Sequence, residues 1–109
     1  MTRLDLYKIM SKYPFEVNYT DRFDGYYFYT GVEYILILKY DKISKIIEMY
    51  RNMTVNEDNY VVFHKDCKTT NFLNSITESA FLDELNKSLK TIKTIKNEIR
   101  KNRIINEFK

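Results

Sequence analysis

The chain has 109 residues, which is enough for one domain with a modest hydrophobic core and too few for two. Its 44% hydrophobic residues, 30% charged residues and net charge of +3 are ordinary for a globular protein and exclude extensive disorder. A single Cys excludes an internal disulfide, and no apolar run approaches the roughly 20 residues of a membrane span. We therefore expect a cytoplasmic protein with no membrane partner, in the host cytoplasm if a phage encodes it.

The first expected elements are a short helix and a strand. Residues 2–12 have a rough apolar face at helical spacing, and Thr2 and Asp5 are placed to cap and favour the helix N-terminus. The helix should end before Pro14, because the residue preceding a proline avoids helical geometry. Residues 15–19 alternate apolar and polar side chains, which predicts a half-buried strand.

The longest apolar and aromatic run is YYFYTGVEYILILKY, residues 26–40, and Asp24-Gly25 indicates a turn just before it. The residues of this run favour strands, and the continuous segment 35–38 is typical of a strand covered on both faces. We interpret Gly31 as a turn that divides the run into two strands. With residues 15–19, these strands predict a three-stranded antiparallel meander at the centre of the fold.

A second helix and a fourth strand are expected after the meander. Asp41 is a plausible N-cap, and apolar residues at helical spacing predict a helix over residues 41–53, lying on the sheet. The alternating residues 60–64 predict the fourth strand, and residues 65–74 read as a polar loop.

The last element is a long basic amphipathic helix over residues 75–108, in which Ser75 and Glu78 fit a capping box. Some thirty helical residues reach roughly 45 Å, which exceeds the width of so small a domain. The first half should pack on the body, and the second half either projects, bends back or meets another chain. We expect the part from about Ile92 to pair with a second copy as a homodimer. The sequence thus predicts a single α+β domain over residues 1–109.

Positive charge is concentrated in this last helix. Residues 85–109 hold eight Lys or Arg against two Glu, a net charge of +6, whereas residues 1–84 have a net charge of −3. Such asymmetry marks a candidate partner surface, and basic side chains neutralise phosphates. The candidate nucleic-acid ligands are Lys87, Lys90, Lys93, Lys96, Arg100, Lys101 and Arg103. Their spacing winds slowly around the helix and does not predict one clean stripe.

No catalytic or metal-binding pattern rises above background, and we expect neither an enzyme nor a cofactor. His64 and Cys67 have the spacing of half a zinc site, but a second pair of ligands is missing. Three acids flank the predicted meander: Asp21, Asp24 and Glu33. Ile35 stands where the Glu-x-Lys pair of a metal-dependent nuclease would need its Lys.

Two surfaces remain without a structural explanation, namely the Tyr-rich strand and the overlong helix. Adjacent strand residues point to opposite faces, and Tyr is enriched at binding hot spots. The candidate protein-interaction residues are Tyr26, Tyr27, Tyr29, Ile95 and Ile99. The leading hypothesis is a small non-enzymatic protein-binding module, such as an anti-CRISPR-like inhibitor or regulator of a host defence or nucleic-acid enzyme encoded by a phage or mobile element. The alternative is a nucleic-acid-binding protein that uses the basic C-terminal helix.

Overall fold

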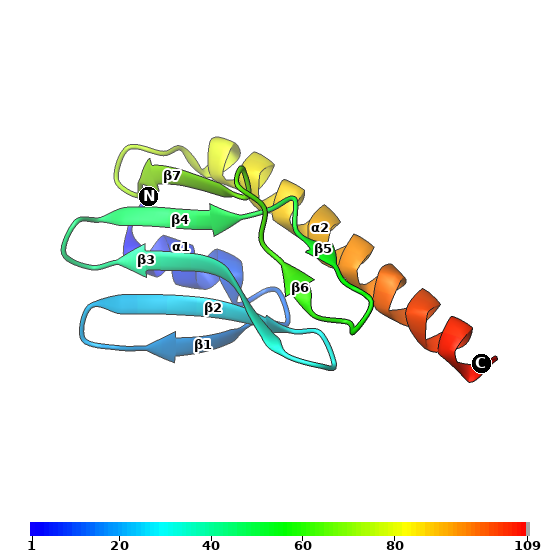
Figure 1. The fold of residues 1–109 in the computed structure, drawn as a ribbon. Helices are drawn as coiled ribbons and strands as arrows, with labels where there is room; N and C mark the ends of the chain where they lie inside the picture. Colours follow the sequence, from blue (N-terminus) through cyan, green and yellow to red (C-terminus); the bar gives the residue numbers. More distant parts are fainter. Residues whose placement is uncertain (109) are drawn as a thin grey trace.

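The computed structural model describes residues 1–108 and has an α+β architecture (Figure 1). A five-stranded antiparallel sheet has the strand order β1-β2-β3-β4-β7, and β5 and β6 form a separate small sheet. The elements are α1 (Arg3–Met10), β1 (Glu16–Tyr19), β2 (Phe23–Tyr29), β3 (Tyr34–Asp41), β4 (Ile46–Tyr50), β5 (Thr54–Val55), β6 (Val61–Val62), β7 (Lys68–Phe72) and α2 (Glu78–Glu107). The predicted α+β class, the meander and the long C-terminal helix are confirmed.

Helix α1 begins with a capping box, as its sequence indicates. The Thr2 hydroxyl accepts a hydrogen bond from the Asp5 amide at 3.1 Å, and the Asp5 carboxylate accepts one from the Thr2 amide at 2.9 Å. Two otherwise unpaired amides of the first turn are satisfied in this way. The buried face of α1 consists of Leu6, Ile9 and Met10.

The turn between β2 and β3 lies at Gly31, as predicted. Gly31 has a φ of +95°, a left-handed conformation that glycine adopts without the steric cost of a Cβ atom. The Thr30 amide donates to the carbonyl of Glu33 at 2.9 Å and closes the turn. The central run is therefore two strands of a hairpin.

The turn predicted at Asp24-Gly25 is wrong, because both residues lie inside β2. The turn between β1 and β2 comes earlier, where the Thr20 hydroxyl accepts from the Phe23 amide at 2.9 Å. Gly25 serves the strand instead, since a Cβ atom there would lie 2.7 Å from the ring of Tyr27. The glycine makes room for an aromatic side chain rather than for a turn.

The helix predicted over residues 41–53 is also wrong. Asp41 ends β3 and caps a tight turn, in which its carboxylate accepts from the amides of Ile43 and Ser44 at 2.9 and 3.3 Å. Strand β4 then returns along β3, with alternating burial that places Ile47 in the core. Ile43, which the helical pattern would bury, is 73% exposed. Strand alternation therefore decides this segment rather than helical spacing.

The predicted fourth strand lies outside the main sheet, and the predicted loop after it contains a strand of the main sheet. Only Val61 and Val62 of the predicted strand form β6, and they pair with β5 outside the main sheet. Residues 65–74, expected as a polar loop, contain β7, which pairs with β4 as an edge of the main sheet. An edge strand with solvent on one side needs few apolar residues, so its polar sequence is not an obstacle.

Helix α2 begins at Glu78, and its cap is Thr77, whose hydroxyl accepts from the Ala80 amide at 3.1 Å. The predicted capping box of Ser75 and Glu78 is therefore wrong by two residues. The first half of α2 lies with α1 on one face of the main sheet. Its shared core consists of Leu6, Ile9, Met10, Tyr26, Leu38, Tyr40, Ile47, Met49, Leu73, Phe81 and Leu85.

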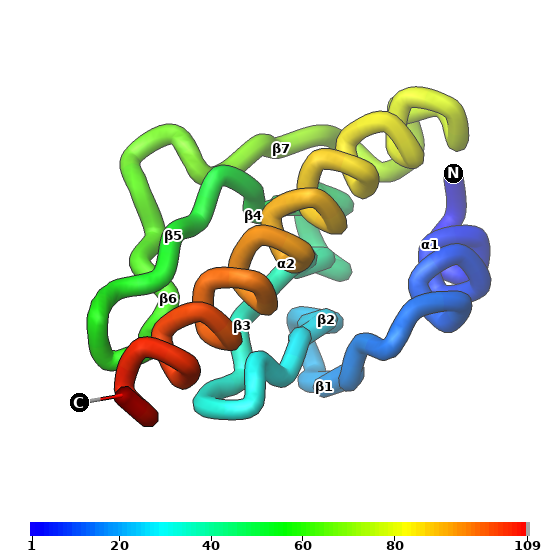
Figure 2. The backbone as a smooth tube through the Cα atoms, turned by 90° about the vertical axis from the view of Figure 1, so that its right-hand side faces the viewer, coloured from blue at the N-terminus to red at the C-terminus, as the bar shows by residue number. Residues whose placement is uncertain are grey.

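The second half of α2 crosses the ends of the strands, with the β5–β6 hairpin alongside it (Figure 2). A second core cluster forms here and contains Phe28, Ile35, Ile37, Met53, Ile92, Ile95 and Ile99. The apolar side chains near the end of the helix that remain exposed are Ile104, Ile105 and Phe108. None of the helices in residues 1–108 has a stretch long and apolar enough to cross a membrane.

Candidate interaction surfaces

The face of the main sheet opposite α1 and α2 carries aromatic side chains from four strands. Paired residues of neighbouring strands share a face, and residues alternate along each strand, so the register identifies the members. Tyr50 of β4 is one of them, and the ring of Phe63 packs edge-on against it. We call the other members, Phe23, Tyr27, Tyr29, Tyr34 and Phe72, the aromatic face. Tyr29, Tyr34 and Phe72 are 49%, 53% and 57% exposed, and the other two side chains are half-buried.

The charged side chains on this face are largely engaged with one another. Arg22 pairs with Asp41 at 3.2 Å, and Lys68 pairs with Glu48 at 3.6 Å. Lys39 lies with its Nζ 3.9 Å from the ring centroid of Phe23. Glu16 accepts a hydrogen bond from the Tyr34 hydroxyl at 3.3 Å. The face therefore combines apolar rings with balanced charge.

Two shallow hollows interrupt the aromatic face. One, of about 320 Å³, is lined by Glu16, Val17, Asn18, Tyr27 and Tyr34. The other, of about 280 Å³, is lined by Arg22, Phe23, Lys39, Asp41, Ser44, Ile46 and Glu48. Such hollows beside exposed rings can receive protruding side chains of another molecule.

The sequence-based interaction candidates divide between surface and core. Tyr27 and Tyr29 lie on the aromatic face, whereas Tyr26, Ile95 and Ile99 are buried in the two core clusters and have no free side-chain surface. Sequence reasoning missed Phe23, Tyr34 and Phe72 as members of the face. Tyr34 was recoverable from the hairpin around Gly31, because antiparallel pairing places it opposite Tyr29.

The seven basic candidates on α2 all point away from its buried side, but in different directions. Lys87 pairs with Glu84 at 3.2 Å. Lys93 and Lys96 line a groove between α2 and the start of the meander. Arg103 lies beside Gly31, where its Nη2 would be 3.4 Å from a Cβ atom. Arg100 continues the same side of the helix. By helical periodicity Lys90 lies about 60° around the helix from Lys93, and Lys101 lies about 100° from Arg100, toward solvent.

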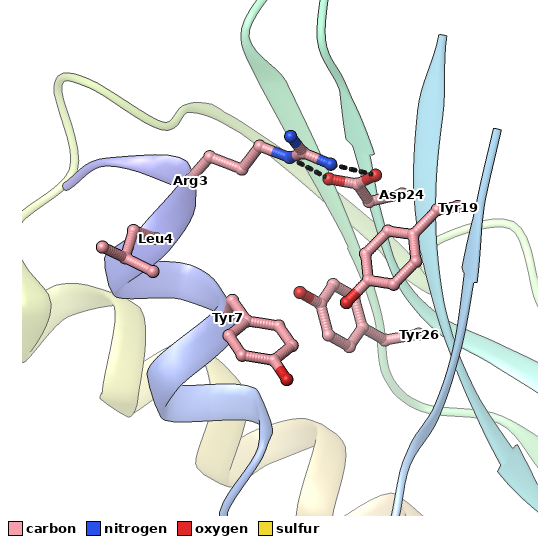
Figure 3. A pocket seen from close by; sticks show the side chains of 6 residues that line it. All are labelled: Arg3, Leu4, Tyr7, Tyr19, Asp24 and Tyr26. Atoms are coloured by element: carbon pink, nitrogen blue, oxygen red, sulfur yellow. Dashed lines mark hydrogen bonds and ion pairs between the residues drawn. The ribbon is translucent and has the colours of Figure 1, made fainter. Parts of the chain in front are cut away.

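A cavity of about 490 Å³ lies between α1 and the strands β1 and β2 (Figure 3). Its lining consists of Arg3, Leu4, Tyr7, Tyr19, Asp24 and Tyr26. Asp24 is 1% exposed and is held by Arg3, with Nε–Oδ2 and Nη2–Oδ1 distances of 2.6 and 3.1 Å. Lys42 adds a second cation, its Nζ 3.4 Å from Oδ1. Asp24 is thus a charge-paired structural carboxylate.

The phenol of Tyr26 forms part of the floor of this cavity. Burial, more than the nearby Tyr19 and Asp24, raises the pKa of Tyr26 well above its ordinary value, so the hydroxyl stays protonated. The cavity offers hydrogen-bonding hydroxyls and one half-exposed guanidinium.

The remaining chemical candidates do not come together. His64 shares a hydrogen bond of 2.7 Å with the Thr54 hydroxyl, and Cys67 is buried. Glu33 accepts a hydrogen bond from the Val61 amide at 2.8 Å, whereas Asp24 is paired with Arg3, so the two carboxylates have separate partners. Within residues 1–108, no three His, Cys, Asp or Glu side chains are grouped closely enough to hold a metal ion.

No protein-family model matches this chain, and no curated protein or solved structure is significantly similar to it. Its function is therefore inferred from side-chain chemistry and geometry. The two surfaces with distinct chemistry are the aromatic face, which is apolar and balanced in charge, and α2, which is basic.

Proposed function

We propose that this chain is a non-enzymatic protein-binding module and that the aromatic face is its contact surface. The observation that carries the proposal is the exposure of Tyr29, Tyr34 and Phe72 on one face of the main sheet. Both helices of residues 1–108 lie on the other face. Exposed aromatic side chains gathered on one surface are a feature of protein interfaces.

The exposed rings of this surface offer apolar area that a partner would bury. An aromatic side chain buries about 150–250 Å² in all, so each half-exposed ring retains roughly 100 Å² for a partner. At about 25 cal/mol per Å², the transfer of that area from water contributes roughly 2.5 kcal/mol per ring before the costs of association. Tyr29 and Tyr34 form one such contact at the β2–β3 hairpin, whereas Phe72 lies beside Ile46 at the opposite end of the sheet. A partner must therefore extend along the face to bury all three rings.

The charge of the face favours a protein over a polyanion. Arg22, Lys39 and Lys68 are matched by acids on the same face, and two of them are already in ion pairs. A nucleic-acid surface would need an excess of unpaired cations. A protein surface with its own mixture of apolar and polar groups is the complementary partner.

A module of this kind acts by occupying the surface of its partner. Asp24, the one buried side-chain carboxylate among residues 1–108, is held by two cations, and the remaining candidates for chemistry are dispersed. Binding without chemistry is how inhibitors and regulators act. We therefore propose that the chain is an inhibitor or regulator encoded by a phage or mobile element.

Site-specific photo-crosslinking tests the proposed contact surface. A photo-reactive phenylalanine analogue at position 34 or 72 should crosslink to a partner in cell extract, whereas the same analogue at position 4 or 7 on α1 should not. The double variant Tyr34→Ser/Phe72→Ser should lose the partner. The matched variant Leu4→Ser/Tyr7→Ser removes two comparably exposed apolar side chains from the other side of the sheet and should retain it. Crosslinking from α1 alone, or equal loss in both variants, would refute the proposal.

A further inference from the structure

We infer a second binding site that goes beyond the proposed function: one side of α2 binds the phosphodiester backbone of a nucleic acid. The side consists of Lys93, Lys96, Arg100 and Arg103, which we call the basic flank. It uses a different element and is positively charged, whereas the aromatic face is balanced in charge, so the two proposals are independent.

The four side chains of the basic flank form a row. Their steps of three, four and three residues stay close to the 3.6 residues of one helical turn, so successive members lie on the same side of the helix. Contacts of two members fix the direction of this side. Lys96 places its Nζ 5.0 Å from the ring centroid of Phe28, and Arg103 lies beside Gly31 in the β2–β3 turn. The row therefore runs along the edge where α2 meets the hairpin.

The charges of the flank are not neutralised by the protein. All four side chains are exposed, and none has a carboxylate within 4.0 Å among residues 1–108, whereas Lys87 on the same helix pairs with Glu84. Glu98 lies on the other side of α2, where it lines a hollow beside β5. Glu107 follows Arg103 by about one turn and ends the basic row. Unpaired, regularly spaced cations are the groups that displace counterions from phosphates.

An apolar groove lies next to the first two members of the flank. It has a volume of about 210 Å³ and is lined by Pro14, Phe15, Phe28, Leu89, Ile92, Lys93 and Lys96. A nucleic acid strand presents phosphates along one edge and apolar sugar and base surfaces beside them. Cations at the rim of an apolar groove match that arrangement, which charge alone would not require.

The length of the flank sets the size of the contact. Ten residues separate Lys93 from Arg103, which is about 15 Å along the helix axis. One strand of a duplex carries a phosphate every 3.4 Å or so along its axis, so the flank spans about four phosphates. The logarithm of the binding constant should then fall with the logarithm of salt concentration with a slope of about −3 to −4.

Fluorescence anisotropy with the full chain measures this binding directly. The probes are a labelled DNA strand and the duplex formed with its complement, titrated between about 50 and 200 mM salt. We expect binding at low salt with the slope given above. Tighter binding of the single strand would indicate that a sugar or base enters the apolar groove. Tighter binding of the duplex would indicate that the flank contacts only the phosphodiester backbone.

Two matched charge reversals on the same helix separate the flank from general electrostatic attraction. Lys93→Glu/Arg100→Glu changes two flank residues. Lys87→Glu/Lys101→Glu changes two exposed residues that lie roughly 80–140° farther around the helix, and it gives the same net charge. Lys96 and Arg103 stay unchanged because they contact Phe28 and the β2–β3 turn. The flank variant should lose at least about tenfold in affinity, and the control variant less than about threefold. Circular dichroism should show equal helix content in both.

Three results would overturn the inference. One is the absence of binding by the unchanged chain at low salt, and another is an equal loss of affinity in the two double variants. The third is binding of polyglutamate as tight as that of DNA, which would show attraction to any polyanion. Tyr34→Ser/Phe72→Ser should leave DNA binding unchanged. Failure of the proposal for the aromatic face would therefore not refute the proposal for the basic flank.

Discussion

Tyr29 and Tyr34 stack across the hairpin that joins β2 to β3, with ring centroids 4.7 Å apart and ring planes inclined by 24°. The two residues are direct cross-strand partners on either side of the Gly31 turn. A hydrogen bond from the Tyr34 hydroxyl to Glu16 on β1 ties the pair to the next part of the meander. The contact that holds the end of the hairpin therefore also presents about half of each ring to solvent.

The stacked pair should be measurable as a coupling energy. In a double-mutant cycle of Tyr29→Ala and Tyr34→Ala, followed by urea unfolding, we expect a coupling of about 0.5–1 kcal/mol, the usual contribution of a cross-strand aromatic pair. The control cycle combines Tyr29→Ala with Tyr7→Ala, since Tyr7 lies on α1 on the other side of the sheet. Distant changes add within roughly 0.3–0.5 kcal/mol. A coupling no larger than that of the control would contradict the stacked geometry.

A second prediction concerns the contribution of the buried Asp24 to stability. Asp24→Asn removes a charge that both Arg3 and Lys42 contact, and leaves these cations without their partner. Loss of one member of a buried ion pair costs about 3–5 kcal/mol, but Arg3 is half exposed, so we expect about 1–3 kcal/mol. Asp21→Asn is the control, because Asp21 is exposed, and should cost less than about 0.5 kcal/mol. Equal unfolding midpoints for the two variants would show that Asp24 is not a structural charge.

The elements that the sequence predicts correctly are those with a single consistent pattern. Helix α1 has its cap and apolar face, and α2 carries apolar residues every three or four positions over most of its length. The Gly31 hairpin follows from one glycine inside a strand-forming run. In each case local preference and tertiary packing agree, so the local pattern is sufficient.

The errors arise where two periodicities fit the same residues. The apolar residues at positions 43, 46, 47 and 50 match a helix, but positions 46–50 also alternate as a strand, and pairing with β3 and β7 favours the strand. Strand β7 has the sequence Lys-Thr-Thr-Asn-Phe, which shows little apolar pattern, and β4 as its neighbour supplies the hydrogen bonds. Such non-local pairing is not visible in a single sequence.

The composition of the aromatic face was only partly predictable for the same reason. Tyr27 and Tyr29 follow from alternation along one strand, but Phe72 belongs to a strand that the sequence does not reveal. The sequence predicts that Ile95 and Ile99 contact a partner, because the helix is longer than the domain is wide. The β5–β6 hairpin, formed from a polar stretch, covers them instead.

Alkaline pH should destabilise the fold through Tyr50. Burial first, and then the charge of Glu48 and the hydrogen bond to it, raise the pKa of Tyr50 to about 12. In the unfolded chain this phenol ionises near its ordinary pKa of about 10. The stabilising contribution is therefore complete below pH 10 and is lost as the pH rises toward 12.

Unfolding midpoints measured from pH 9 to 12, roughly spanning both pKa values, test this prediction. Tyr50→Phe should show a shallower loss of stability over this range than the unchanged chain, although Tyr26 still contributes in the same direction. Tyr60→Phe, at an exposed position, should follow the unchanged chain. A Tyr50→Phe profile that coincides with that of Tyr60→Phe would contradict the assigned environment of Tyr50.

The second half of α2 offers a direct comparison of intramolecular packing with pairing between copies. Ile95 is fully buried among Met53, Ile92 and Ile99, whereas Ile104 is about half exposed. Ile95→Ala should lower the free energy of unfolding by about 2–4 kcal/mol at any protein concentration, because it removes buried methyl groups and leaves a cavity. Ile104→Ala should change it by less than about 0.5 kcal/mol if the end of the helix is free.

Light scattering and urea unfolding at two widely separated protein concentrations check this comparison. A homodimer formed through the end of α2 would raise the stability with concentration and make Ile104→Ala costly, because association with a second copy stabilises the folded state by mass action. A concentration-independent midpoint with a monomeric mass would assign the stability of α2 to the β5–β6 hairpin and the sheet alone. In that outcome Ile95 belongs to the core of one chain, and the exposed Ile104, Ile105 and Phe108 are the residues to vary in any search for a partner of the helix end.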